Sequence, residues 1–393
     1  MNIIPGKLLP KAEKHVKKGH PWVFDQGIDL LKKEGTTGDV VVLFDQSKNK
    51  FLAFGLLDLD SPIRIKILQS HTPSKLDEAW VLEKVERAFE IRKPLLKTET
   101  NSFRLIFGEN DSLPSLVCDV YNRVAVVKLY SAIWWPYLEW VVNAIVKILP
   151  LDAVVLRLSR KLENNQKGIK NGAVIWGELN NEVQVFKEHG LLFEANVLKG
   201  HKTGYFLDHR ANRKRVGELS KGKRVLDVFS YAGGFSVHAL VGGAERVSSV
   251  DISRQALELA KSNAKLNQFT GQHEVLVGDA FEVLQDLKEQ KRKFDVVVID
   301  PPSFAKQASE VEGALSSYER LTKLGCGLLA KNGIMVMASC SSRVSSDNFF
   351  ELVEGVLKNY FPQYQLLSRW GHDIDHPVAF DEGAYLKCGF YQV

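Results

Sequence analysis

Short apolar runs and helix-period segments alternate along the C-terminal half of the chain. Phe294–Ile299 is apolar enough to be buried on both faces of a sheet. Arg254–Leu266 has helical spacing with Ser253 as its N-cap, and a helix from about Tyr318 to Ala330 is expected to end at Asn332-Gly333. This alternation predicts a parallel α/β sheet with strands at Val225–Val228, Glu274–Val277, Phe294–Ile299, Ile334–Ala338 and Tyr385–Tyr391.

The N-terminal region shows a different, strand-rich pattern. Short β-like runs at Val40–Phe44, Phe51–Leu56 and Ile63–Leu68 are divided by polar turns, which predicts a compact β-barrel ending near Ser70. The chain is therefore expected to divide into a β-barrel, an α+β domain and an α/β domain, over residues 1–70, 71–194 and 195–393.

The middle region combines helices, strands and a hairpin. Apolar residues recur at helical spacing over residues 76–89, and this helix is expected to stop at Pro94. A strand at Val124–Leu129 precedes a helix around Trp134–Ile148, where the tryptophan pair favours a core or interface role over base stacking. A hairpin is expected to turn at His189-Gly190.

Composition places the chain among ordinary globular proteins. Its 393 residues are 45% apolar, which suffices for two or three domain cores. Neither a secretory signal pattern nor an apolar run long enough to span a bilayer is found, so a cytoplasmic location without membrane contact is expected. The cysteines are too few and too scattered for a disulfide framework or a zinc site: Cys118, Cys326, Cys340 and Cys388.

The charge is mildly basic and unevenly distributed. A net charge of +5 permits a polyanionic partner without requiring one. A charge cluster taken alone is as readily a solvated face as a binding surface. One cluster precedes residue 21, with Lys7, Lys11, Lys14, Lys17 and Lys18, and a second contains Arg157, Arg160, Lys161, Lys167 and Lys170.

The stretch Arg224–Asp251 indicates a nucleoside-cofactor site. It reads as strand, glycine-bearing turn, helix at Phe235–Val241, and second strand. Gly233 and Gly234 allow close approach of a ligand, and the Asp251 carboxylate can accept ribose hydroxyl protons. The turn lacks the three spaced glycines of a pyrophosphate site. A cofactor with ribose but no phosphates fits better, and S-adenosylmethionine is such a cofactor.

Acidic or reactive residues mark the ends of five expected strands. Ligands in open α/β sheets bind outside the carboxyl ends of the strands, so the fold would gather these residues onto one rim: Asp227, Asp251, Asp279, Asp300 and Cys340. A single aspartate there would be read as a cap or turn residue. If their strands are neighbours, the ends bearing Asp300 and Cys340 lie roughly 5 Å apart.

Several motifs carry a family resemblance that covers essentially the whole chain. They are GHPWVF from Gly19, GENDSLPSLVCD from Gly108, KTGYFLDHR from Lys202, and the later stretches FSYAGGFSVHAL, DPPSFAK, SCS and DHPVAFDEGAYLK. In these motifs the chain resembles the bacterial and archaeal 23S ribosomal RNA 5-methylcytosine methyltransferases of the ribosomal large subunit methyltransferase I type. The resemblance implies an N-terminal PUA domain, a central RNA-binding-type domain and a C-terminal Rossmann-like class I methyltransferase domain.

The resemblance also implies which residues surround the cofactor. S-adenosylmethionine is expected near Tyr205, Asp208, Arg210, Asp251, Asp279 and Asp300, with Phe206, Asp227, Phe229, Tyr231, Gly233, Ile252, Ala280 and Pro301 completing the cofactor set. RNA is expected to contact Pro302, Phe304, Lys306, Lys14, Lys17 and Lys18. One departure from the family pattern is His209, where glutamine is expected.

Methylation of cytosine C5 requires a nucleophile, because C5 becomes electron-rich only after addition at C6. A thiolate performs this addition well, and Cys340 is the candidate, whereas Cys118, Cys326 and Cys388 read as packing residues. Enzymes with two catalytic cysteines carry the second after the proline of the aspartate-proline motif, where this chain has Pro302. Asp300 is the best polar group to bind the N3 or N4 edge of a flipped base, and the group that removes the C5 proton stays open.

Two other functions remain open from the sequence. An Asp-Pro-Pro turn also orients ring or exocyclic nitrogens of guanine or adenine for methylation, a reaction that needs no thiol. A non-catalytic rRNA-binding assembly factor could keep the same fold. In each case the expected partner is 23S rRNA or a large-subunit assembly intermediate, and the sequence leaves homodimer formation undecided.

Overall fold

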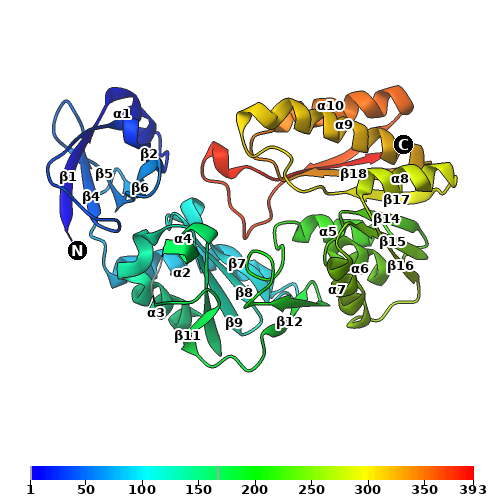
Figure 1. The fold of residues 1–393 in the computed structure, drawn as a ribbon, viewed down its shortest axis with the longest axis horizontal. Coiled ribbons are helices and arrows are strands. Elements are labelled where there is room, and N and C mark those ends of the chain that lie inside the picture. Colours follow the sequence, from blue (N-terminus) through cyan, green and yellow to red (C-terminus); the bar gives the residue numbers. More distant parts are fainter. Residues whose placement is uncertain (1, 166–167) are drawn as a thin grey trace. The chain divides into compact units, whose positions relative to one another are not determined.

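The computed structural model describes residues 2–165 and 168–393. The described chain forms two compact units (Figure 1). The first unit comprises residues 1–186, 195–206 and 374–383, and the second comprises residues 187–194, 207–373 and 384–393. Each unit is described by itself below. Among the described residues, no helix combines the length and apolar character needed to cross a membrane.

The N-terminal part of the first unit is a six-stranded sheet with one helix. Its strand order is β2-β6-β5-β4-β1-β3. The three predicted strands are confirmed, and the last one, β6, ends at Ser70. Three further strands and a helix were not expected. The elements are β1 (Ile3–Leu8), α1 (Pro10–Lys17), β2 (Trp22–Phe24), β3 (Ile28–Leu31), β4 (Val40–Phe44), β5 (Phe51–Leu57) and β6 (Ile63–Ser70).

The remainder of the first unit is a five-stranded sheet packed against two helices (Figure 1). The strand order is β11-β10-β9-β8-β7. Trp134 is fully buried and its indole donates to the Pro114 carbonyl at 2.6 Å, so it is a core residue. The elements are α2 (Glu78–Leu96), β7 (Ser102–Phe107), β8 (Leu116–Tyr121), β9 (Val124–Leu129), α3 (Leu138–Ile148), β10 (Ala153–Leu158), α4 (Arg160–Asn165) and β11 (Ala173–Gly177).

Two helix boundaries of this part differ from the prediction. α2 continues through Pro94 to Leu96. A proline perturbs the helical turn that precedes it, so residues after Pro94 can still complete the last turn of the helix. The predicted helix from Trp134 begins as a 3₁₀ segment, Ala132–Tyr137, and becomes α-helical only at Leu138. Pro136 lies inside that 3₁₀ segment.

The hairpin at His189-Gly190 is confirmed. β12 (Val183–Glu188) and β13 (Leu191–Asn196) pair as a two-stranded sheet. His189 and Gly190 have φ angles of 50° and 81°, the left-handed values that a two-residue turn between antiparallel strands requires.

The second unit is a seven-stranded sheet of order β16-β15-β14-β17-β18-β20-β19. Figure 1 shows the helices α5–α7 and α8–α10 as two groups on opposite sides of this sheet. The strands are β14 (Arg224–Val228), β15 (Arg246–Asp251), β16 (Gln272–Val277), β17 (Phe294–Ile299), β18 (Leu329–Ser339), β19 (Gln365–Trp370) and β20 (Lys387–Gln392). The helices are α5 (Arg210–Glu218), α6 (Gly234–Val241), α7 (Arg254–Lys265), α8 (Ala280–Glu289), α9 (Val311–Leu328) and α10 (Ser346–Tyr360).

Three predictions for this unit are corrected. The helix expected from Tyr318 begins at Val311. It ends at Leu328, and Asn332 and Gly333 lie inside β18, where Leu329 is buried and pairs with Phe294. The last strand begins at Lys387, two residues later than expected, and it runs antiparallel to both of its neighbours, β18 and the unpredicted β19, whereas a parallel sheet was expected.

Candidate active site

The carboxyl ends of five parallel strands form the rim on which the candidate site is built. β14 pairs with β15 on one side and with β17 on the other, so the strand order reverses between β14 and β17. Ligands of open α/β sheets bind at such a point. The predicted gathering of strand ends is confirmed, and along the rim they run in the order Asp279, Asp251, Asp227, Asp300 and Cys340.

The turn after β14 holds a strained backbone close to the neighbouring helix. Phe229 and Tyr231 have φ angles of 63° and 46°, a left-handed conformation that costs side-chain-bearing residues energy and is concentrated at functional sites. Gly233 has a φ of 75°, and a Cβ atom there would lie 2.8 Å from that of Ala260. Glycine is therefore required for this turn to lie against α7.

Asp251 organises the same turn from the end of β15. Its carboxylate accepts hydrogen bonds from the backbone N–H groups of Tyr231 at 2.9 Å and Ser253 at 2.8 Å. The next residue, Ile252, is 73% exposed. A carboxylate beside a bare aliphatic side chain suits a nucleoside, since one group can bind ribose and the other can cover a base. The residues present therefore fit a cofactor of that class.

Asp227 lies beneath the turn and is fully buried. It accepts from the backbone N–H and the hydroxyl of Ser236, at 3.0 Å and 2.6 Å. Burial raises the pKa of Asp227 to about 7 against the effect of these bonds, and the charges of Asp300 and Asp251 add to the rise. Asp227 ties the first turn of α6 to β14 and is placed to support the rim from below.

Asp279 has a local structural role at the rim. It is the N-cap of α8, accepting from the backbone N–H of Phe281 at 2.9 Å, and the adjacent Ala280 is buried. Capping of this kind stabilises a helix start. The capping interpretation of a lone aspartate therefore applies here, alongside its position on the rim.

Asp300 faces a histidine across the switch point. Its Oδ1 atom lies 3.3 Å from Nε2 of His209, whose Nδ1 is 3.0 Å from the Asn212 side-chain amide. Burial lowers the pKa of His209, but the negative charges of Asp300 and Asp208 raise it and leave it above its ordinary value. The residue that departs from the family pattern is thus an ion-pair partner of the predicted active-site aspartate.

This pair predicts a pH-dependent effect of the substitution His209→Gln. The folded-state pKa of His209 is raised, so the stability that its charge contributes is present in full below the ordinary histidine value, about 6.5, and is lost as pH rises through the raised value. We expect His209→Gln to lower the melting temperature more at pH 6 than at pH 9, measured by calorimetry. The exposed His15→Gln variant is the control, and an equal loss at both pH values would contradict the ion pair.

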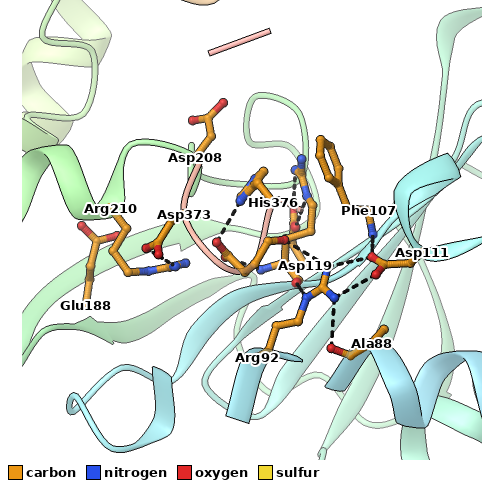
Figure 2. A network of polar contacts seen from close by, with 12 residues as sticks. Ala88, Arg92, Phe107, Asp111, Asp119, Glu188, Asp208, Arg210, Asp373 and His376 are labelled. Atoms are coloured by element: carbon orange, nitrogen blue, oxygen red, sulfur yellow. Dashed lines mark hydrogen bonds and ion pairs between the residues drawn. The ribbon is translucent and has the colours of Figure 1, made fainter. Parts of the chain in front are cut away.

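Asp208 and Arg210 also form contacts within the second unit. Tyr385 donates its hydroxyl hydrogen to Asp208 at 2.8 Å. Arg210 is fully buried, and its Nη1 lies 3.1 Å from Oδ2 of Asp373 (Figure 2). Both residues therefore help to hold the segments around α5, and their predicted cofactor contact stays a prediction.

Tyr205 and Phe206 belong to the first unit. The Tyr205 ring is buried 5.1 Å from that of Phe186, and its backbone N–H donates to the Tyr121 hydroxyl at 3.0 Å. The Phe206 ring lies below the ammonium of Lys202, 4.2 Å from its centroid. These contacts describe Tyr205 and Phe206 within their own unit and leave their predicted cofactor role untested.

The four cysteines separate into one accessible and three buried thiols. Cys118, Cys326 and Cys388 are buried, and burial raises the pKa of each thiol, to about 12 for Cys326. Their predicted packing role is confirmed. Cys340 is half-buried, and its Sγ lies 3.7 Å from the Pro301 carbonyl oxygen. β17 and β18 are parallel neighbours, so the predicted adjacency of Cys340 and the Asp300 turn is confirmed.

The turn after Asp300 presents the residues expected to contact RNA. Pro301 is buried, whereas Pro302 and Lys306 are exposed. Phe304 is half-buried and meets the edge of Tyr318, with 5.2 Å between ring centroids. The Phe304 ring therefore packs partly against the core of the second unit.

The predicted basic residues of the first unit lie at its surface. Lys14, Lys17 and Lys18 are exposed on or beside α1, and Lys17 pairs with Glu13. In the second cluster Arg157 is buried and donates to the carbonyls of Val197 and Gly200, so it is structural. Arg160, Lys161 and Lys170 are exposed, and Lys167 lies outside the described residues.

One residue of the site was missed by sequence reasoning. Lys387 is the first residue of β20, is 4% exposed, and donates to the carbonyls of Ser341 and Val344 just after Cys340. A lysine opening an otherwise apolar strand, KCGFYQ, was the available signal. Its proximity to Cys340 depends on the placement of β20 beside β18, which the sequence did not reveal.

Comparisons with known proteins agree with this fold and rim. The model of a family described as S-adenosylmethionine-dependent methyltransferase matches residues 113–380, and that of a PUA-like domain matches residues 7–70. A putative S-adenosylmethionine-dependent methyltransferase structure from Streptococcus mutans superimposes with a TM-score of 0.83 at 22% identity, covering 99% of this chain and 100% of that one. This likeness concerns the fold alone.

Two curated relatives match nearly end to end. A ribosomal RNA large subunit methyltransferase of Deinococcus radiodurans is 41% identical over 390 residues, covering 97% of this chain and 95% of the relative. A ribosomal RNA large subunit methyltransferase I of Tolumonas auensis is 33% identical over 385 residues, covering 97% of each. The α/β rim fits a nucleoside, and the N-terminal domain is PUA-like. This chain belongs to the S-adenosylmethionine-dependent methyltransferases of the ribosomal RNA large subunit methyltransferase I family.

Proposed function

We propose that the protein methylates C5 of a cytosine in 23S ribosomal RNA, with Cys340 as the covalent nucleophile. The single observation that carries the cytosine assignment is the position of Cys340. It is the one half-buried thiol among four, at a strand end next to the Asp300 turn. The RNA substrate is inferred from the names of the two relatives described above.

The proposed chemistry needs a thiolate that adds and then leaves. Cys340 forms a sulfur–carbon bond to C6, and the electrons of the C5–C6 double bond make C5 nucleophilic. When bound, S-adenosylmethionine would supply the methyl group that C5 takes, and its sulfonium sulfur would leave as a thioether with the bonding electron pair. A base then takes the C5 proton, the C–H electrons restore the double bond, and the sulfur–carbon pair returns to Cys340. Asp300 hydrogen-bonds the N3 or N4 edge of the base and holds it for addition.

The function is tested by trapping the covalent intermediate. The protein and S-adenosylmethionine are incubated with 23S rRNA containing 5-fluorocytidine, in which fluorine replaces the proton that must leave. We expect a complex that resists denaturation and contains the Cys340 peptide. RNA with ordinary cytidine is the control. A trapped peptide containing another residue would overturn the assignment.

The two alternatives predict different results. A methyltransferase acting on a purine nitrogen would form no adduct with 5-fluorocytidine and would place the methyl group on guanine or adenine, as nucleoside mass spectrometry would show. A non-catalytic assembly factor would bind rRNA but would transfer no methyl group. The half-buried thiol beside the Asp300 turn favours the cytosine reaction over both.

Asp251 is proposed to bind the ribose of the cofactor. We expect Asp251→Ala to weaken S-adenosylmethionine binding roughly 10- to 100-fold, because a hydrogen bond to a charged group contributes about 1.5–3 kcal/mol. The loss is measured by isothermal titration calorimetry. Asp251→Asn keeps an acceptor for the Tyr231 N–H and should lose less. Asp286→Ala, at an exposed position of α8, is the neutral control, and unchanged affinity in Asp251→Ala would contradict the assignment.

A basic and aromatic patch on the first unit is proposed to contact RNA. This Lys128 patch comprises Lys128, Tyr130, Arg160, His201 and Lys202. Tyr130 is 49% exposed, with the Lys128 ammonium 5.5 Å from its ring centroid. Burial and then the like charges of Arg157 and Lys202 lower the pKa of Lys128. Concentrated positive charge beside an exposed ring suits a phosphate backbone with unstacked bases.

The Lys128 patch predicts a change in the salt dependence of RNA binding. We expect Lys128→Ala/Lys202→Ala to weaken rRNA binding and to reduce the slope of log affinity against log salt by roughly 0.7 per lysine. Fluorescence anisotropy at several salt concentrations measures the slope. The exposed Lys97→Ala variant of the same unit is the control. A slope equal to that of the unmodified protein would remove the patch from the interface.

A further inference from the structure

The loop that carries Cys340 is held by a buried ammonium group. β18 and β20 are antiparallel neighbours, and Ser339, the last residue of β18, pairs with Lys387. Cys340 is the next residue along the chain. Nζ of Lys387 donates to the carbonyl oxygen of Ser341 at 2.6 Å and to that of Val344 at 2.8 Å. Both acceptors belong to the loop between β18 and α10, so Lys387 fixes the path of the chain immediately after the thiol.

Lys387 has no conventional charge partner in the described part of the chain. Within residues 2–165 and 168–393, both hydrogen-bond acceptors of its ammonium are backbone carbonyl oxygens, and no carboxylate charge acts on it. Burying an ammonium group is costly unless a compensating charge is present. Burial lowers the pKa of Lys387 to about 8, and the one charge that acts to raise it is that of Cys340. The thiolate is therefore the natural counter-charge of this lysine.

The hydroxyl groups around Cys340 fix the geometry of the loop and add no charge to it. The Tyr318 hydroxyl lies 2.8 Å from that of Ser339 and 3.2 Å from that of Ser341. The Ser303 hydroxyl lies 3.0 Å from that of Ser341. The loop is thus fixed on both sides of Cys340. The negative charge of Asp300 opposes a thiolate at Cys340, and both charges act on Tyr318. Tyr318 itself adds no charge, because burial raises the pKa of its hydroxyl.

We propose that Lys387 is the positioning residue that prepares Cys340 as a nucleophile, holding its loop through two carbonyls and supplying the positive charge that favours the thiolate. The inference rests on the proposed covalent role of Cys340 for its meaning, but the pair itself can be measured without RNA. Interaction between charges is reciprocal, so a thiolate that stabilises the ammonium is stabilised by it in turn.

The test is the rate at which iodoacetamide alkylates Cys340 in the intact protein as a function of pH. Only the thiolate reacts, and peptide mass spectrometry separates Cys340 from the three buried thiols. We expect Lys387→Met to slow alkylation at pH 7 about tenfold, which corresponds to one pK unit. The difference should shrink above pH 8, where Lys387 loses its own charge. Lys331→Met, at an exposed lysine of β18, is the control.

A second variant separates charge from folding. Lys387→Arg keeps a positive charge and should retain most of the alkylation rate, whereas Lys387→Met should show an intact circular dichroism spectrum and intact S-adenosylmethionine binding. If Lys387→Met alkylates like the unmodified protein at pH 7, the inference is overturned. If the loss is the same at every pH, Lys387 acts only on the shape of the loop and the charge role is overturned.

The outcomes also distinguish this inference from the proposed function. Slow alkylation in Lys387→Met together with failure of the unmodified protein to trap 5-fluorocytidine would leave the Lys387–Cys340 pair standing and remove the cytosine chemistry. Successful trapping of 5-fluorocytidine together with unchanged alkylation in Lys387→Met would support the cytosine chemistry and remove the Lys387–Cys340 pair. If both hold, Lys387→Met should lower kcat for methyl transfer and leave KM for S-adenosylmethionine unchanged, with activity partly recovered at higher pH.

Discussion

Replacement of Cys340 by alanine is expected to abolish methyl transfer while leaving cofactor binding intact. Removing a covalent nucleophile typically costs about 10⁴-fold or more in kcat. Cys340 lies at the end of β18, next to the carbonyl of Pro301 and away from Asp251 along the rim, so its loss should not disturb the proposed ribose contact. The measurement is transfer of a radiolabelled methyl group to 23S rRNA, with calorimetry reporting the affinity for S-adenosylmethionine.

The control for this prediction is another cysteine. Cys326 is buried in α9, and Cys326→Ala should keep full activity per folded molecule even if its stability falls. Substantial activity in Cys340→Ala would end the cytosine proposal and favour methylation of a purine nitrogen, which requires no thiol. The experiment thus decides between two reactions that the same fold can support.

Replacement of Asp300 by asparagine is expected to give the second-largest loss. A group that positions the reacting base or moves a proton contributes about 10²- to 10⁴-fold to the rate, and Asp300 leaves the sheet at the point where the strand order reverses. The substitution also removes the negative partner of His209, 3.3 Å away. We therefore expect kcat to fall at least about 10²-fold, with a smaller change in the affinity for S-adenosylmethionine.

Asp295→Asn is the matched control, because Asp295 lies near the opposite end of the same strand, where it pairs with Arg224. Its activity should stay near that of the unmodified protein. If Asp300→Asn retained full activity, Asp300 would have no role in the reaction. If rRNA binding survived in both Asp300→Asn and Cys340→Ala, and neither the variants nor the unmodified protein transferred a methyl group, the assembly-factor alternative would be favoured.

The buried network of the first unit illustrates what local sequence patterns could not predict. Arg92, on α2, donates to both carboxylate oxygens of Asp111, at 2.8 Å and 2.7 Å (Figure 2). It also donates to the carbonyl of Asp375 at 3.1 Å. Asp375 follows Arg92 by 283 positions in the chain. The pattern around Arg92 predicted a helix, but no local signal indicated that its guanidinium would be buried against a segment so distant in sequence.

Boundaries were predicted best where one local force dominated. The strands β4, β9 and β17 begin and end where the apolar runs predict, because burial of a continuous run outweighs other preferences. The predicted end of α9 was wrong. Asn332-Gly333 is a strong local signal for the end of a helix, but the pairing of β18 with β17 and β20 overrides it. A local preference for a helix end is overridden where the segment can pair as a strand with neighbours on both sides.

The chain by itself determined the α/β alternation, the glycine-bearing turn before Asp251, the acidic residues at strand ends and the accessible thiol candidate, since each depends on neighbours within a few positions. Only the tertiary structure decided that β20 lies between β18 and β19 and so delivers Lys387 to the Cys340 loop, and that His209 meets Asp300. The physical reason is that strand pairing and the burial of charge join residues by their place in the sheet. The spacing of residues along the chain does not indicate which strands pair or which charged groups are buried together.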